Sequence, residues 1–352
     1  MGSTMKAVTF HEHGGLEKLI YEDVAFPQVG PDEILIRVKA CALNHLDIWI
    51  RQGIPTYTIS LPHISGCDVS GVIERVGTAY SGHLEAGQSV FVNPGISCGI
   101  CDECLTGKEN RCAHFQILGA QRNGGYAEYV TVPALNVIPL PENLTFEQAA
   151  AFPLVSMTAW HMVKTLADVQ PGESVLVMGG GSGVGSMAIQ MANLLGARVL
   201  STVGAEDKKA KSKMLGADEV IDHSSENVSE RVADLTQGHG VDVVIEHIGQ
   251  EVWEHCMKSL SRGGRLVTCG ATSGGASQFD VRYLYSRQLT IMGSYMGTRN
   301  ELLETTRLIE TDKLRPVVDS TFPLEEARNA QERMLARKIF GKVVLVPESR
   351  KV

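Results

Sequence analysis

The sequence predicts an α/β fold in which a β-rich first domain is followed by a doubly wound, six-stranded parallel sheet. Three observations predict it. Short alternating apolar runs fill the first part of the chain, continuous apolar runs alternate with helical stretches from residue 174 onward, and a glycine-rich turn joins the first of these runs to a helix. The chain has 352 residues and 43% hydrophobic content, which is enough to bury two cores.

The first domain, residues 1–153, has the pattern of β-structure. Runs such as "ILIRVKA" and "YAEYVTVP" alternate between Lys6 and about Asn136, and glycine and proline separate them. Thr145 followed by Gln148 predicts a capped helix start, and Pro153 interrupts that helix. We therefore expect a domain boundary near residue 154.

The second domain, residues 154–295, carries six apolar runs separated by helical stretches. Such runs are typical of buried parallel strands. They are "SVLVMG", "RVLSTVG", "EVIDH", "VDVVIEHIG", "GRLVTCG" and "LTIMGSY". The last segment, residues 296–352, contains strands without the helices needed to extend this layer, so we expect it to return to the first domain.

Charge and composition limit the classes of partner. The net charge of −8 leaves no basic stripe, so we expect neither nucleic acid nor a membrane surface as a partner. No run reaches the roughly 18 apolar residues of a membrane span, and the N-terminus lacks the apolar core of a signal peptide. These features favour a cytoplasmic protein that acts on small molecules.

The glycine-rich turn "GGGSGVG", residues 179–185, lies between the first predicted strand and helix of the sheet. Glycines there let the backbone approach a pyrophosphate, and the helix start favours its negative charge. We expect Ser182, Gly183, Val184 and Gly185 to bind a dinucleotide. Ser182 stands where the usual fingerprint has its middle glycine, and a purely structural turn is the alternative.

The end of the second strand predicts which dinucleotide is bound. An acidic side chain there would hold the ribose of NAD, but the turn consists of Val203, Gly204 and Ala205, and Lys208 and Lys209 follow one helical turn later. Lysines there suit a 2'-phosphate, so NADPH is the predicted cofactor. NADH stays possible, since Glu206 or Asp207 could reach a ribose and the lysines could form a solvated face.

Four cysteines are spaced C-x-x-C-x-x-C-x7-C, at Cys98, Cys101, Cys104 and Cys112. Four thiolates close a tetrahedron around zinc and leave no position for a substrate, so this spacing predicts one structural zinc per chain. An iron–sulfur site is the rival, but its common run has a shorter last spacing and a following proline. A redox C-x-x-C pair would need a neighbouring βαβ unit.

These features together resemble the medium-chain dehydrogenase/reductase family over nearly the whole chain. The resemblance implies a GroES-like catalytic domain built from both chain ends, with its structural zinc lobe at about residues 95–113. It also implies a Rossmann domain between those ends and a cleft where the two domains meet.

The resemblance also bears on catalytic zinc. Zinc alcohol dehydrogenases read like C-G-V-C-H-T-D where this chain has "CALNHLD", so their first metal ligand falls on Asn44. Their other two ligands fall on Cys67 and Leu154. Catalytic zinc needs three protein ligands, so we expect none here. A rearranged site that combines Cys67 with Asp68, Cys41 or His45 is the alternative, and it would make the protein an alcohol dehydrogenase or aldehyde reductase.

The pair Asn44 and Asp47 instead is similar to the quinone and enone reductases of the family. That similarity implies a 2'-phosphate site with Gly204 and Lys208, to which His223 and Arg337 would contribute. In such a reductase, donors replace the metal in stabilising charge on the substrate oxygen. Asn44 is the first candidate donor, and His45 and Tyr57 are candidates to donate or relay a proton. The candidate catalytic residues are therefore Asn44, His45, Asp47 and Tyr57.

The remaining candidates surround the expected nicotinamide. The resemblance places Thr158 and Gly270 near the cofactor, and His247 ends the fourth strand, where ligands gather in such sheets. The edge run "LTIMGSY" pairs across a dimer in this family, so a homodimer or homotetramer is expected. The favoured function is an NADPH-dependent reductase of a carbonyl or quinone, and a non-enzymatic binding or structural role is the third alternative.

Overall fold

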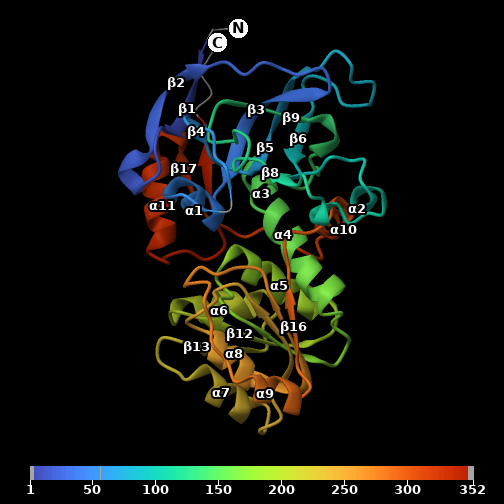
Figure 1. Ribbon diagram of the computed structural model, residues 1–352, viewed down its shortest axis with the longest axis vertical. Coiled ribbons are helices and arrows are strands. Elements are labelled where there is room, and N and C mark those ends of the chain that lie inside the picture. The colour runs from blue at the N-terminus through green and yellow to red at the C-terminus, as the bar shows by residue number, and fades with distance from the viewer. Residues whose placement is uncertain (1–3, 56, 348–352) are drawn as a thin grey trace. The chain divides into compact units, whose positions relative to one another are not determined.

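The computed structural model describes residues 4–55 and 57–347 and divides the chain into two compact units (Figure 1). Unit 1 comprises Met1–Leu154, Thr298–Leu302 and Pro316–Val352, and unit 2 comprises Val155–Gly297 and Leu303–Arg315. Two of the four boundaries fall inside helices, in α4 (Pro153–Trp160) and α10 (Arg299–Glu310).

Unit 1 is mainly β-structure, as its alternating runs predict. Its large sheet has the order β10-β6-β5-β3-β18-β17, and β9 also pairs with β3. Its strands are β3 (Glu33–Ala42), β5 (Asp68–Val76), β6 (Ser89–Val92), β9 (Tyr129–Pro133), β10 (Val137–Pro139), β17 (Val318–Pro323) and β18 (Lys342–Val346). The smaller sheets join β1 (Thr4–Phe10) to β2 (Ile20–Ala25) and β4 (His63–Ile64), and β7 (Gly95–Ile96) to β8 (Gln116–Ile117).

Short helices complete this unit. They are α1 (His45–Gln52), α2 (Asp102–Leu105), α3 (Phe146–Ala150) and α11 (Ala327–Leu335), with 3-10 turns η1 (Leu16–Lys18), η2 (Glu109–Arg111), η3 (Ala134–Asn136) and η5 (Leu324–Glu326). Thr145 and Gln148 form the capping box that their spacing predicts, and α3 starts directly after it. The small side chains of Ala150 and Ala151 let α3 pack closely on β3 and β18.

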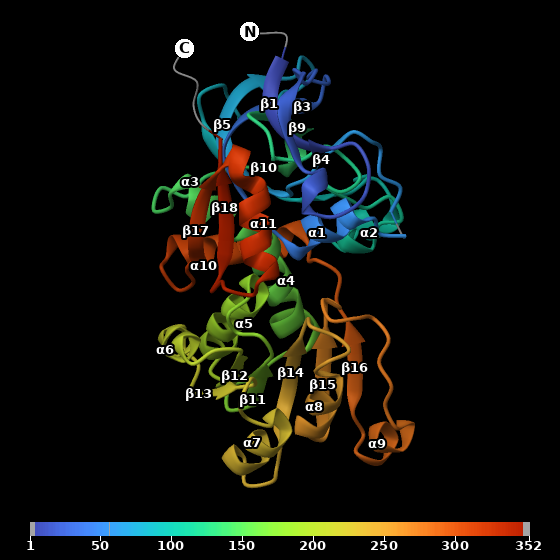
Figure 2. The ribbon, with the colours of Figure 1, turned by 90° about the vertical axis from the view of Figure 1, so that its left-hand side faces the viewer.

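Unit 2 contains six parallel strands in the order β13-β12-β11-β14-β15-β16, which confirms the predicted doubly wound sheet (Figure 2). They are β11 (Ser174–Val177), β12 (Arg198–Val203), β13 (Glu219–Asp222), β14 (Val241–Glu246), β15 (Leu260–Thr268) and β16 (Thr290–Gly293). The helices are α5 (Gly183–Leu194), α6 (Asp207–Met214), α7 (Val228–Leu235), α8 (Trp253–Ser259) and α9 (Val281–Ser286), with the π-helical turn η4 (His161–Leu166). Its core is aliphatic, as fully buried strands require.

The C-terminal segment is divided between the units. Strands β17 and β18 join the large sheet of unit 1 through β3, whereas Leu303–Arg315 groups with unit 2. In the described residues, no helix is long and apolar enough to cross a membrane.

Candidate functional site

Three neighbouring strand ends of unit 1 bring distant polar residues together. Strand β3 is flanked by β5 and β18, and the register pairs Ala42 with both Asp68 and Val344. Asn44 follows β3, Asp68 starts β5 and Lys342 starts β18. These three strand ends therefore carry an amide, a carboxylate and an ammonium group side by side.

These three side chains form a closed hydrogen-bonded network, which we call the Asn44–Asp68–Lys342 network. Lys342 Nζ donates to Asn44 Oδ1 at 2.6 Å and to Asp68 Oδ2 at 3.0 Å. Asn44 Nδ2 donates to Asp68 Oδ2 at 2.8 Å and to Cys67 Sγ at 3.2 Å, and the N–H of Leu154 donates to Asp68 Oδ1 at 2.9 Å. All three positions that correspond to metal ligands in zinc alcohol dehydrogenases thus meet around a carboxylate that is paired with a lysine.

Asp47 lies beside this network but faces the protein interior. Its carboxylate accepts hydrogen bonds from the N–H of Asn44 at 2.8 Å, the N–H of Gly66 at 3.2 Å and the hydroxyl of Tyr126 at 3.0 Å. It forms a capping box with Asn44 at the start of α1. Burial raises the pKa of Asp47 to about 6, although the hydrogen bonds oppose this effect. Asp47 therefore holds Asn44 in place.

The raised pKa of Asp47 predicts a pH-dependent contribution to stability. Because the folded chain binds this proton more tightly than the unfolded chain, the contribution is complete below the unfolded pKa of 3.8 and is lost as pH rises through about 6. It amounts to about 3 kcal/mol. The difference in opening free energy between the wild type and Asp47→Asn, from hydrogen exchange of β3 peptides corrected for intrinsic rates, should fall by this amount between about pH 4 and pH 7. A pH-independent difference would contradict it.

The thiols near the network are deeply buried. Burial raises the pKa values of Cys41 and Cys67 well above the usual range, and Asp47 and Asp68 add to the effect. In the absence of a metal such surroundings favour the protonated thiol, whereas a bound metal would itself favour the thiolate. Within the described part of the chain, the side chains near the network do not form a group of three or more histidine, cysteine or carboxylate ligands arranged to hold a metal.

The other two candidate catalytic residues lie nearby in sequence. His45 is the first residue of α1, is half-buried and packs edge-on against Trp49 with ring centroids 5.1 Å apart. Tyr57 is also half-buried, in the loop after α1, and its N–H donates to the carbonyl of Ile54. Both side chains are partly accessible, unlike Asp47.

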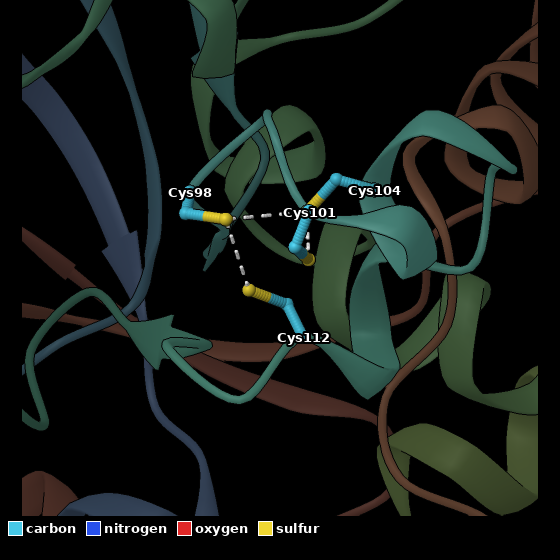
Figure 3. A group of neighbouring side chains, drawn as sticks. All are labelled: Cys98, Cys101, Cys104 and Cys112. Atoms are coloured by element: carbon cyan, nitrogen blue, oxygen red, sulfur yellow. Dashed lines mark hydrogen bonds between the residues drawn. The ribbon is translucent and has the colours of Figure 1, made fainter.

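The four predicted zinc ligands converge in a separate lobe of unit 1 (Figure 3). Their sulfur atoms all lie within 4.8 Å of one another, and the Cys98–Cys104, Cys101–Cys104 and Cys98–Cys112 distances are 3.9, 3.5 and 3.6 Å. Tetrahedral Zn–S bonds of about 2.3 Å place sulfur atoms about 3.8 Å apart. Backbone N–H groups of Ile100 and Cys101 lower the pKa of Cys98 to about 6, whereas, against the N–H of Cys104, the neighbouring thiols raise the pKa of Cys101 to about 12. The arrangement fits a structural zinc ion.

The glycine-rich turn of unit 2 has the geometry of a phosphate site. Ser182 caps α5, and its Oγ accepts the N–H of Gly185 at 2.8 Å. A Cβ on Gly185 would lie 2.3 Å from the carbonyl oxygen of Gly179, so only glycine fits there. The first N–H groups of a helix have no partners within it and can bind an anion. Gly183 and Val184 are the first two residues of α5.

Two of the expected 2'-phosphate residues, Gly204 and His223, are neighbours within unit 2. Val203 ends β12, and a Cβ on the next residue, Gly204, would lie 2.9 Å from Nε2 of His223, so these two residues are neighbours. Lys208 lies in the first turn of α6. Arg337 belongs to unit 1, just after α11, whereas the other three belong to unit 2.

Unit 2 also has a cavity of about 380 Å³ at the C-terminal ends of β15 and β16. Its lining includes Gly270, Cys269 and Ser294. Among the described residues, the buried hydroxyls of Ser294 and Thr158 have no hydrogen-bond partner. Buried hydroxyls of Ser65, Ser201 and Ser212 are likewise unpartnered in the described part of the chain, so it is the place of Ser294 in the cavity lining that fits a polar ligand there.

Comparisons with known proteins agree with this geometry. The alcohol dehydrogenase GroES-like domain family matches residues 30–142, and the zinc-binding dehydrogenase family matches residues 183–311. An NAD-dependent alcohol dehydrogenase of Sulfolobus acidocaldarius is 31% identical over 97% of this chain and 99% of its own length. The quinone oxidoreductase of Rattus norvegicus is 31% identical over 97% of this chain and 98% of its own length. This chain belongs to the medium-chain dehydrogenase/reductase superfamily.

Solved structures give the same result. A crystal structure of an NAD-dependent alcohol dehydrogenase matches with a TM-score of 0.93 and 44% identity, and covers 97% of this chain and 99% of that one. A cobalt- and zinc-bound thermostable alcohol dehydrogenase from Pyrobaculum aerophilum matches with a TM-score of 0.89 and 33% identity, over 98% and 100%. As a member of this superfamily, the protein is an NAD(P)-dependent oxidoreductase with a GroES-like domain and a Rossmann sheet.

For this medium-chain dehydrogenase/reductase, sequence reasoning missed Lys342 and Ser294. The signal for Lys342 was a single charged residue at the start of the apolar run "KVVLV", and such a residue is usually solvated. Ser294 follows the edge strand directly, at the strand end where ligands gather in parallel sheets.

Proposed function

We propose that this protein is an NADPH-dependent reductase of an α,β-unsaturated carbonyl or a quinone, and that it acts without catalytic zinc. The observation that carries the proposal is the Asn44–Asp68–Lys342 network. Among Asn44, Cys67, Leu154 and their direct sequence neighbours, only Asp68 carries a carboxylate, and Lys342 places a positive charge beside it. Both charged side chains are at least 95% buried.

The network leaves little capacity for a metal ion. Both oxygens of Asp68 already accept hydrogen bonds, and Cys67 is a buried thiol that accepts one from Asn44. A divalent cation would have to compete with the ammonium group of Lys342 for the same carboxylate. Repulsion between the two cations at this short range opposes that exchange.

The reaction requires a hydride, a proton and stabilisation of charge on the substrate oxygen. A bound dihydronicotinamide supplies the hydride. Both N–H bonds of the Asn44 side-chain amide already donate, one to Cys67 and one to Asp68. The amide can therefore donate to a substrate oxygen only by giving up its bond to Cys67. Sulfur is the weaker acceptor, which makes that exchange the easier one. His45 and Tyr57 are the candidates to supply the proton.

The preference for NADPH rests on the turn after β12. No carboxylate occurs at Val203, Gly204 or Ala205, and the first acidic residue, Glu206, pairs with Lys209 at 2.9 Å. This arrangement leaves Glu206 poorly suited to bind a ribose. Among the relatives, names that specify NAD-dependent alcohol dehydrogenase and names that specify quinone oxidoreductase both occur, so the preference needs a direct test.

Replacing Lys208 by Ser is expected to weaken NADPH binding roughly tenfold and to leave NADH binding nearly unchanged, because a charge-assisted hydrogen bond to the 2'-phosphate is lost. Dissociation constants from the fluorescence of the reduced nicotinamides measure both. Lys213→Ser, in the last turn of the same helix, is the matched control. Equal losses for NADPH and NADH would contradict the assignment of Lys208.

The deciding experiment combines zinc analysis with turnover. Elemental analysis of the wild type and of Cys67→Ala is expected to give about one zinc per chain in both, since four thiolates form one closed site. The Cys256→Ala variant, with a buried thiol in unit 2, is the control. NADPH oxidation with quinones and enones should persist in a chelator. A second zinc that disappears in Cys67→Ala, together with chelator-sensitive alcohol oxidation, would overturn the proposal.

The second candidate is an alcohol dehydrogenase or aldehyde reductase with an irregular zinc site. The names of the relatives favour it, since several are alcohol dehydrogenases and one of the similar structures contains zinc and cobalt. The zinc analysis above separates the two candidates.

We also propose a homodimer or homotetramer formed through β16, because this edge strand has half-exposed Ile291 and Met292 and a second copy would cover it. Cytoplasmic location remains a prediction from the sequence.

A further inference from the structure

Ser182 and His247 form a pair that the cofactor-binding turn does not require. Ser182 occupies the position of the middle glycine in the usual dinucleotide fingerprint, and its Oγ lies 3.0 Å from Nε2 of His247. The same Oγ accepts the N–H of Gly185. The hydroxyl therefore joins the start of α5 to the end of the neighbouring strand.

Packing holds the His247 ring in this position. Strands β11 and β14 are parallel neighbours, so the turn after β11 and the residue after β14 lie at the same sheet edge. A Cβ on Gly179 would lie 3.2 Å from Cε1 of His247, and a Cβ on Gly270 would lie 2.7 Å from its carbonyl oxygen. Glycines on both sides thus make room for the histidine.

The direction of the Ser182–His247 hydrogen bond decides what the serine can do. If Nε2 carries no proton, the serine hydroxyl donates to it and has no hydrogen left for a ligand. If Nε2 is protonated, it donates to Oγ, and the serine hydrogen becomes available to a phosphate oxygen. The two states of the bond therefore differ in their affinity for an anion.

The surroundings bias the free protein toward the neutral ring, and the neutral tautomer with its proton on Nδ1 is the one that accepts the serine hydrogen at Nε2. Burial lowers the pKa of His247, and this effect outweighs the opposing influence of Glu246 and of the nearby carbonyl groups of His247, Met178 and Gly179. Glu246 is the charged group that acts on the ring, but its carboxylate already accepts the N–H groups of Ile248 and Gly249 and the hydroxyl of Thr268. A bound pyrophosphate would add negative charge on the other side of the ring.

We propose that dinucleotide binding protonates His247, and that the imidazolium donates to Ser182 so that the serine hydroxyl donates to a pyrophosphate oxygen. His247 is then a positioning residue that couples cofactor affinity to pH. The inference rests on the dinucleotide binding assumed by the proposed function, but not on the substrate or on catalytic zinc.

Calorimetry tests the proton directly. NADPH is titrated into the full-length protein between pH 5.5 and 8 in two buffers of different ionisation enthalpy, and the difference in heat gives the protons taken up. We expect uptake of up to about one proton and an affinity that rises by up to about tenfold per pH unit as pH falls. ADP-ribose, which has the pyrophosphate without the nicotinamide, should behave alike. His247→Gln keeps a donor to Ser182 and should bind without this proton uptake.

A double-mutant cycle tests the coupling through Ser182. His247→Leu should weaken NADPH binding roughly tenfold at pH 5.5, because the imidazolium that donates to the serine oxygen is lost, and should make the affinity nearly independent of pH. In a Ser182→Gly background the same change should alter affinity by less than about twofold. Equal effects in both backgrounds, or equal proton uptake by the wild type and His247→Gln, would overturn the inference. Because every readout is a binding measurement, failure here is distinguishable from failure of the proposed reductase activity.

Discussion

Replacing Lys342 by Met is expected to lower the free energy of unfolding of unit 1 by about 3–5 kcal/mol. The substitution keeps the length and apolar part of the side chain but removes the ammonium group. Asp68 is fully buried and Lys342 is 5% exposed, so solvent screens the pair very little. Without the lysine, Asp68 keeps only neutral donors, Asn44 and the N–H of Leu154. The loss thus comes mainly from an uncompensated buried charge.

The measurement must report on unit 1 alone, because a chain with two units need not unfold in one step. Hydrogen exchange followed by mass spectrometry of peptides from β3 and β5 gives the local free energy of opening. The double variant Lys342→Met with Asp68→Asn should recover much of the loss, since it removes both charges. The control Lys6→Met removes an exposed partner of Asp23 and should change stability by less than about 1 kcal/mol. A small effect of Lys342→Met would contradict the expected stabilisation of Asp68 by the lysine.

Lys342 shows why part of the candidate site could not be predicted from the sequence. Lys342 and Asn44 are 298 positions apart, and only the pairing of β18 with β3 brings them together. Strand pairing between distant segments leaves no local pattern in one sequence. The metal-ligand positions could be compared with the family one by one, but the lysine that pairs with Asp68 could not be found in this way.

Local patterns, in contrast, were sufficient for most of the fold. Each of the six strands of unit 2 corresponds to a separate apolar run, and the glycine-rich turn predicts the helix that follows it. The four cysteines lie within fifteen positions, so their convergence needs only short loops. Helix α10 is divided between the units, with Leu303–Arg315 in unit 2, and helix periodicity does not reveal which unit a helix packs against.

Asp47 illustrates a different limit. Its position after Asn44 and the family resemblance suggested a catalytic group, yet its carboxylate accepts from two backbone N–H groups and from Tyr126, which is 79 positions away. A buried carboxylate with three donors organises its neighbours more directly than it meets a substrate. Its role in catalysis therefore acts through the position of Asn44, and stays a prediction.

Replacing Cys104 by Ser is expected to reduce the zinc content from about one ion per chain to nearly none, because the closed site loses one of its four thiolates. The lobe has little else to hold it. Within residues 98–112 the large apolar side chains, Ile100 and Leu105, are 81% and 71% exposed, and the helices α2 and η2 are a few residues long. Metal binding then supplies most of the free energy that folds this segment, as in small zinc domains.

Hydrogen exchange of peptides covering residues 98–112 should show protection lost in Cys104→Ser, while peptides from unit 2 stay as in the wild type. Cys269→Ser, which changes a half-buried thiol of unit 2, is the matched control and should keep its zinc. If reductase activity with a quinone survives the loss of zinc in part, the metal is structural and the Asn44–Asp68–Lys342 network does not depend on it. A lobe that keeps its protection without zinc would instead show that its loops are held by contacts other than the four cysteines.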